Sequence, residues 1–89
     1  MTRQDLANAS DTLESAAEET SDADAAERLA SLADQLDTLA TRDRDPDHGR
    51  LARIENALND LEDQTEDVAE QIRSAHESVV AFRETVEGV

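Results

Sequence analysis

The chain has 89 residues, one aromatic residue, no cysteine and a formal net charge of −15. This length allows one small domain with a modest apolar core, and the lack of cysteine excludes disulfides and thiolate metal sites. No apolar run approaches the roughly 20 residues of a membrane span, and the N-terminus has no apolar signal core, so the sequence predicts a cytoplasmic protein.

The first half of the chain predicts a helical arm over about residues 3–41. Helix-favouring residues predominate, and the segment contains neither Gly nor Pro. Two apolar seams follow one another, and their phase slips near residues 20–22. A second helix could start at Ser21-x-x-Asp24, but Glu18 and Glu19 would be unfavourable at the C-terminus of a preceding helix. We predict one bent helix, with two short helices as the alternative. The two seams are Leu6, Ala9, Leu13 and Ala16, then Leu29, Leu32, Leu36 and Leu39.

A turn is predicted at about residues 42–48. Asp43, Asp45 and Asp47 have the alternate spacing of the first ligands in an EF-hand calcium loop. The glycine arrives one residue late, however, and Ile54 stands where such a loop needs a bidentate Glu. Pro46 suits the first position of a helix capped by Asp45. We interpret the segment as a capped turn and keep the three aspartates as weak candidates for a cation site.

The second half predicts one helix over about residues 49–87. Apolar residues recur at alternating steps of three and four, and Thr65 is the single polar occupant of the register. A disordered acidic chain does not keep such a register, so we predict a continuous helix roughly 60 Å long, at ~1.5 Å per residue. Its seam is Leu51, Ile54, Leu58, Leu61, Thr65, Val68, Ile72, Ala75, Val79, Phe82, Val86 and Val89.

The two arms match when the chain is folded at about residue 45. Apolar positions at equal distances from the fold then face one another, from Leu39 with Leu51 out to Leu6 with Val86. The predicted fold class is therefore all-α, a long antiparallel helical hairpin forming one domain. Further apolar positions beside the seam widen the stripe beyond a two-stranded seam; they are Ala26, Ala30, Ala33, Ala40, Ala57 and Val80.

Burial of this wide stripe predicts a second layer of helices. Pairing of two hairpins into a homodimeric four-helix bundle would provide it, and a three-helix bundle is the alternative if the first arm breaks near residues 20–24. The expected partner is therefore a second copy or another helical protein. The residues predicted to carry assembly are Leu6, Leu13, Leu29, Leu32, Leu36, Leu39, Leu51, Ile54, Leu58, Leu61, Val68, Ile72, Val79, Phe82 and Val86.

The charge pattern indicates adaptation to concentrated salt. The chain has twelve Asp and eleven Glu, and all eight basic residues are Arg. At 1 M salt the Debye length is only about 3 Å, so the self-repulsion of such a chain is largely screened. This acid-rich, Lys-free composition resembles the small acidic helical proteins of extremely halophilic archaea, many of unknown function. The resemblance is compositional and implies no activity.

The sequence argues against several classes of function. No phosphate loop, nucleophile motif or metalloprotease motif occurs, and the seam has no inward Glu for a carboxylate metal site. We therefore expect no enzymatic activity, no cofactor and no small-molecule substrate. The acidic charge and missing aromatics disfavour nucleic-acid binding. The leading hypothesis is a structural or protein-interaction module; the alternatives are an acidic binder of basic proteins and a weak calcium-responsive module at the turn.

Overall fold

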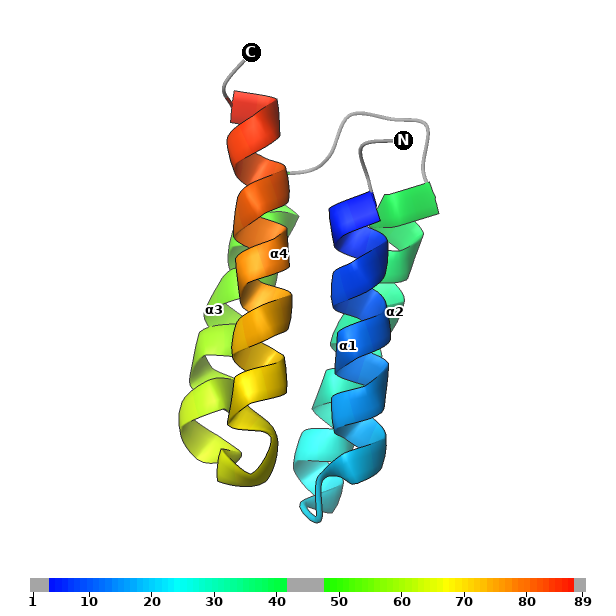
Figure 1. The fold of residues 1–89 in the computed structure, drawn as a ribbon, viewed down its shortest axis with the longest axis vertical. Helices are drawn as coiled ribbons and strands as arrows, with labels where there is room; N and C mark the ends of the chain where they lie inside the picture. The colour runs from blue at the N-terminus through cyan, green and yellow to red at the C-terminus, as the bar shows by residue number, and fades with distance from the viewer. Residues whose placement is uncertain (1–3, 42–47, 88–89) are drawn as a thin grey trace.

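A computed structural model describes residues 4–41 and 48–87. The described part is all-helical and contains no strand. Its elements are α1 (Gln4–Glu19), α2 (Ala23–Thr41), α3 (His48–Gln64), the short 3-10 helix η1 (Glu66–Val68) and α4 (Ala69–Glu87). The four long helices stand side by side as an up-down-up-down bundle (Figure 1). The bundle measures 39 × 20 × 18 Å.

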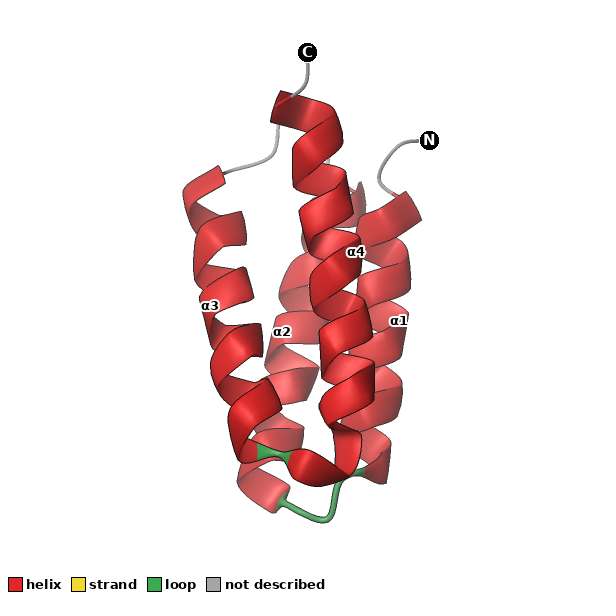
Figure 2. Ribbon diagram, turned by 60° about the vertical axis from the view of Figure 1, so that its left-hand side comes forward, coloured by secondary structure: helices red, strands yellow, loops and turns green. Residues whose placement is uncertain are grey.

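The helices form two antiparallel hairpins that lie against each other. The first hairpin is α1–α2 and the second is α3–α4, and α1 also packs on α4. The backbones of α2 and α3 approach each other less closely than those three pairs do. The turn between α1 and α2 and the connection through η1 lie together at one end of the bundle (Figure 2). We call this the loop end and define it as residues 18–24 and 63–70.

The structure corrects the prediction of two continuous arms about 60 Å long. The first arm breaks at residues 20–22 and the second at Thr65, so each arm folds back on itself. One chain thus forms by itself the four-helix bundle that we predicted from two chains. The predicted three-helix alternative is also wrong, because it includes only the first break. The predicted pairing of the two arms far from the turn is retained as contact between helices, since α1 packs on α4.

The break between α1 and α2 is fixed by side chains of the turn. Asp22 is the N-cap of α2, because its Oδ1 accepts a hydrogen bond from the backbone N–H of Ala25 at 3.1 Å. The hydroxyl oxygen of Thr20 accepts from the N–H of Asp22 at 3.2 Å. The cap lies one residue after the Ser21 of the predicted capping sequence, and it coincides with the slip in the apolar register.

The break between α3 and α4 consists of a single non-helical residue. Thr65 has φ −126° and ψ 77°, and its hydroxyl caps neither flanking helix. Its N–H still donates to Leu61 O at 2.9 Å, and its carbonyl accepts from Val68 N at 3.3 Å. No residue of the described chain has a positive φ, so the direction of the chain reverses here without a residue in the left-handed region.

The core contains the predicted seam residues whose side chains the structure describes. Folding each arm back explains this, because a lone hairpin would leave much of the apolar stripe in water. Ala33 joins the core, while Ala40 and Ala57 pack against it. The side chain of Val86 lies outside the described residues. The buried seam residues are Leu6, Leu13, Leu29, Leu32, Leu36, Leu39, Leu51, Ile54, Leu58, Leu61, Val68, Ile72, Val79 and Phe82.

A buried hydroxyl links α1 to α2. Ser10 Oγ donates to the carbonyl oxygen of Ala33 at 2.7 Å, and Ser10 is 2% exposed. We expect Ser10→Ala to lower the free energy of unfolding by about 1 kcal/mol, which is typical of one buried hydrogen bond. Urea unfolding would measure it. Ser15→Ala on the exposed face of the same helix is the matched control, and an equal loss in both variants would contradict a role for the hydrogen bond.

Candidate functional site

Asp43, Asp45 and Asp47 lie outside the described residues, as does the Pro46 start of the second arm. Within residues 4–41 and 48–87, no group of three or more His, Cys, Asp or Glu side chains is placed to hold a metal ion. None of the described helices combines the length and apolar character that a membrane crossing requires.

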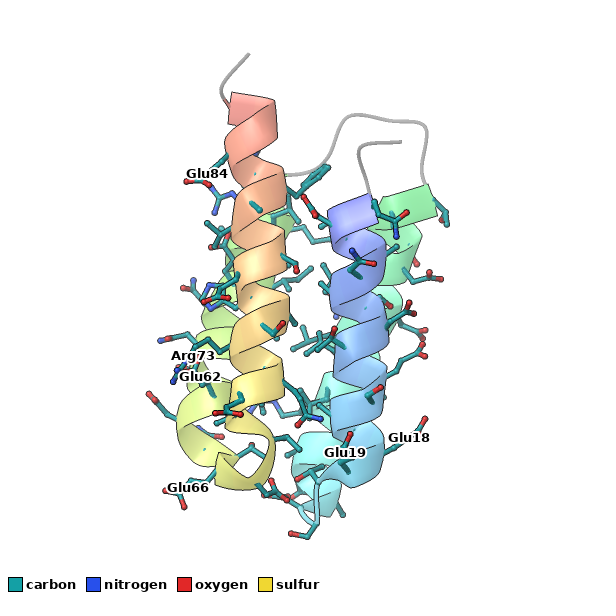
Figure 3. All side chains as sticks on the ribbon, viewed as in Figure 1. Glu18, Glu19, Glu62, Glu66, Arg73 and Glu84 are labelled. Carbon is teal, nitrogen blue, oxygen red and sulfur yellow. The ribbon has the colours of Figure 1, made fainter. Side chains whose placement is uncertain are left out.

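Two Arg–Glu ion pairs and one His–Glu contact cross from α3 to α4 on one outer face of the bundle. Arg73 donates from Nε and Nη2 to Glu62 Oε2, at 3.0 and 2.9 Å. Glu55 accepts from Arg83 Nη1 through Oε2, and its Oε1 lies 3.5 Å from His76 Nε2. The hydrogen bond and the charge of Glu62 raise the pKa of Arg73 above its ordinary value. Figure 3 shows Arg73 and Glu62 directed toward one another.

A shallow, open groove runs along α4 beside these ion pairs. Val80 is 36% exposed and lies in the groove, which has Arg73 toward one end and Glu84 at the other. A second shallow groove adjoins it and is lined by Glu55, Val80, Arg83 and Glu84. We call this surface the α3–α4 face. It comprises Glu55, Glu62, Arg73, His76, Glu77, Val80, Ala81, Arg83 and Glu84.

The loop end is strongly acidic. Residues 18–24 and 63–70 carry four carboxylates each and no basic residue. Glu18, Glu19 and Glu66 are seen there at the bottom of Figure 3. At the opposite end, Arg50 and Arg53 lie near the start of α3. Charge is thus uneven along the long axis of the bundle, with carboxylates gathered at the loop end and two arginines near the opposite end. The sequence shows this only in part, because the two acidic segments are far apart in the chain.

Asp67 ties the two hairpins together at the loop end. Its carboxylate accepts hydrogen bonds from the hydroxyl of Thr20 at 3.0 Å and from the backbone N–H of Ser21 at 2.9 Å. The Ser21 hydroxyl donates to it at 3.3 Å. Beside it, Gln71 Nε2 donates to Glu19 Oε2 at 2.9 Å. We call the hydrogen bonds of Asp67 to Thr20 and Ser21 the Asp67 tie. No local sequence pattern predicts it, since Ser21 and Thr20 lie 46 and 47 residues before Asp67 in the chain.

The contribution of the Asp67 tie to the stability of the fold is expected to depend on pH. The hydrogen bond from the Ser21 N–H, helped by those from the two hydroxyls, lowers the pKa of Asp67 below its ordinary value. A lowered pKa in the folded state stabilises the fold above the unfolded-state pKa, and this stabilisation is lost as the pH falls through the folded-state pKa. We therefore expect Asp67→Asn to destabilise the protein at pH 7 and to have a smaller effect below about pH 4.

Unfolding in urea at pH 7, 5 and 3 would test this effect. Asp63→Asn is the matched control, because it removes an exposed carboxylate of the same loop end. A difference between wild type and Asp67→Asn that stays constant over this pH range would contradict the assigned role of the ionised carboxylate.

The sequence predicts the core residues but not the residues of the α3–α4 face. The predicted assembly seam lies inside the chain's own core. Glu55, His76 and Arg83 meet only because α3 and α4 form a hairpin at Thr65. His76 and Val80 are one helical turn apart and therefore lie on one face of α4. The apolar register runs unbroken through Thr65, so the sequence does not indicate that this face lies next to α3.

Comparison with known proteins assigns the chain to a family. A model of a family of unknown function, DUF7553, matches residues 1–85, and the chain belongs to this family. No curated protein and no solved structure matches it. The family carries no assigned activity.

Proposed function

We propose that this member of DUF7553 is a structural interaction module that associates with a second copy of itself through the α3–α4 face. The observation that supports the proposal is the groove on α4, with exposed Val80 inside it and opposite charges toward its two ends. The proposal assigns the chain no catalysis, in line with the prediction from the sequence.

The charges of the groove suit a two-fold contact. Arg73 and Glu84 are eleven residues apart, which is about three helical turns, so they lie on the same side of α4. In an antiparallel contact between two copies of α4, a two-fold axis brings Arg73 of each copy opposite Glu84 of the other. Val80 of each copy is then covered near the middle. The contact is self-complementary, as an interface between identical chains must be.

The surface of α1 disfavours close approach more strongly than the α3–α4 face does. Helix α1 carries five carboxylates and no basic residue. The α3–α4 face instead includes Arg73 and Arg83 among its four glutamates. Two chains of charge −15 repel one another in dilute buffer, and this face is where the repulsion is partly offset.

The proposed contact is small and therefore weak. One helical face buries less than the ~1,200 Å² that stable interfaces need, so we propose a reversible dimer. This differs from the seam-to-seam dimer predicted from the sequence, because the seam is buried within the chain. We also propose that the chain works in concentrated salt, which would screen the repulsion between copies; the cytoplasm of a salt-accumulating cell is the compartment that this implies.

Light scattering in about 2 M KCl tests the proposed dimer. For chains that have not been unfolded and refolded, we expect a mass that rises toward twice that of the chain with increasing concentration, and we expect Val80→Asp to stay monomeric without losing thermal stability. Ala30→Asp, at an exposed position on α2, is the matched control and should still dimerise. If wild type stays monomeric, or both variants dimerise equally, the proposal is wrong.

A further inference from the structure

We infer that the chain can exchange α4 with a second copy, by straightening of the α3–α4 junction at Thr65 into one continuous helix. In the exchanged form, α4 of each copy would pack on α1 and α3 of the other. This inference is independent of docking through the α3–α4 face, since it uses the buried seam and not the groove.

The junction is close to helical already. Only Thr65 separates α3 from η1, and η1 continues directly into α4. The N–H of Thr65 keeps the helical bond to Leu61 O, and the cap position after η1, Ala69, has helical angles of φ −58° and ψ −39°. Rotation of the backbone mainly at one residue therefore converts the turn into a helix.

The hydroxyl of Thr65 has an unmet hydrogen bond in the closed form. Thr65 is 3% exposed, and its Oγ1 is buried with no hydrogen-bond partner. A buried hydroxyl without a partner is unfavourable. Within a continuous helix, a threonine hydroxyl can donate to the carbonyl one turn earlier, here that of Leu61. Straightening would thus supply the bond that the closed form lacks.

The apolar register also continues through the junction. Leu58, Leu61, Thr65, Val68 and Ile72 keep steps of three and four, so a straight helix would present one continuous seam. The α1–α2 turn is different, because there the register slips and Asp22 caps α2. The sequence therefore favours opening at Thr65 over opening at residues 20–22.

Exchange would cost few contacts. The bonds from Glu62 to Arg73 and from Glu55 to Arg83 can form again between copies, because each α4 takes the same place in the other bundle. The Asp67 tie is different, since Asp67 belongs to η1 and its position next to Thr20 and Ser21 depends on the closed turn. The closed form is thus held at the junction mainly by this tie.

Distance measurement between two spin labels within one chain tests the exchange. The chain has no cysteine, so Arg53→Cys with Ser74→Cys gives one labelled pair on exposed positions of α3 and α4, outside the α3–α4 face. In the closed hairpin the helix axes are about 10 Å apart, whereas 21 residues of continuous helix span about 32 Å. The labelled chain is refolded with excess unlabelled chain at high protein concentration, so that only distances within a chain are seen.

Two variants at the junction sharpen the result. In the wild-type chain we expect a distance component near ~32 Å. In Asp67→Ala, which lacks the charge-assisted Asp67 tie, we expect the dimerisation constant of the exchanged form to be about tenfold larger. Glu66→Pro should abolish the component, because proline suits the first position of η1 and breaks a continuous helix. Glu66→Ala, the matched control, should retain it.

The outcomes separate this inference from the proposed dimer. A long component that survives Val80→Asp and disappears in Glu66→Pro supports exchange. A doubled mass with only short distances within a chain supports docking through the α3–α4 face and overturns exchange. Short distances at every concentration, in Asp67→Ala as well, also overturn it.

Discussion

Replacement of Leu58 by Asp is expected to abolish the folded state. Leu58 is 0% exposed in the core. Loss of a buried leucine costs about 3 kcal/mol, and an unpaired buried carboxylate adds several kcal/mol more. A chain of this size has a total stability of roughly 5–13 kcal/mol, so most of it would be lost. Circular dichroism in concentrated KCl should show weak helicity and no cooperative thermal transition.

The adjacent residue supplies the control for this experiment. Asn59 is exposed on the next position of α3, and Asn59→Asp adds the same charge without entering the core. We expect that variant to melt close to wild type. If Leu58→Asp keeps the helicity and the transition of wild type, the position of α3 in the bundle is wrong.

Removal of salt is expected to have the second largest effect on the stability of the fold. The net charge of −15 is concentrated on a bundle 39 Å long. The Debye length grows from about 3 Å at 1 M salt to about 30 Å at 0.01 M, a distance comparable to the whole molecule. Dialysis from about 2 M KCl to about 0.01 M KCl should therefore cause cooperative loss of helicity, which circular dichroism would follow.

A pair of glutamates tests whether charge causes this loss. Glu66 belongs to the acidic loop end, whereas Glu62 forms an ion pair with Arg73. Glu66→Gln should lower the KCl concentration at the midpoint of folding, since it removes repulsion. Glu62→Gln removes the same charge together with an attraction, so it should leave the midpoint unchanged or raise it. Equal shifts in both variants, or helicity that is independent of salt, would contradict the proposed adaptation to salt.

Most of the core can be predicted from the sequence, because apolar periodicity reports directly on which side of a helix is buried. The break at residues 20–22 leaves a signal as well, in the register slip and in the short polar side chains that cap α2. Glu18 and Glu19 argued against that break. Both lie at the end of α1 nonetheless, and Glu19 receives a hydrogen bond from Gln71 across the hairpins. Local dipole arguments are weak, at about 1 kcal/mol or less, and tertiary contacts outweigh them here.

The break at Thr65 could not be predicted from local patterns. The register continues through it, and neither Gly nor Pro marks it. What decides the fold there is burial of the wide apolar stripe, and this depends on contacts of α4 with α1, far away in the sequence. The Asp67 tie and the α3–α4 face follow from the same break. The candidate site was therefore missed for one reason, since each of its contacts depends on the position of α4.

The packing of α1 on α4 joins the first described helix to the last. During synthesis, the α1–α2 hairpin can form early from neighbouring residues, but the apolar side of α1 that faces α4 stays uncovered until α4 has been made. Contacts between such distant segments slow the final step of folding. In that interval the nascent chain displays an apolar surface of the kind that chaperones bind.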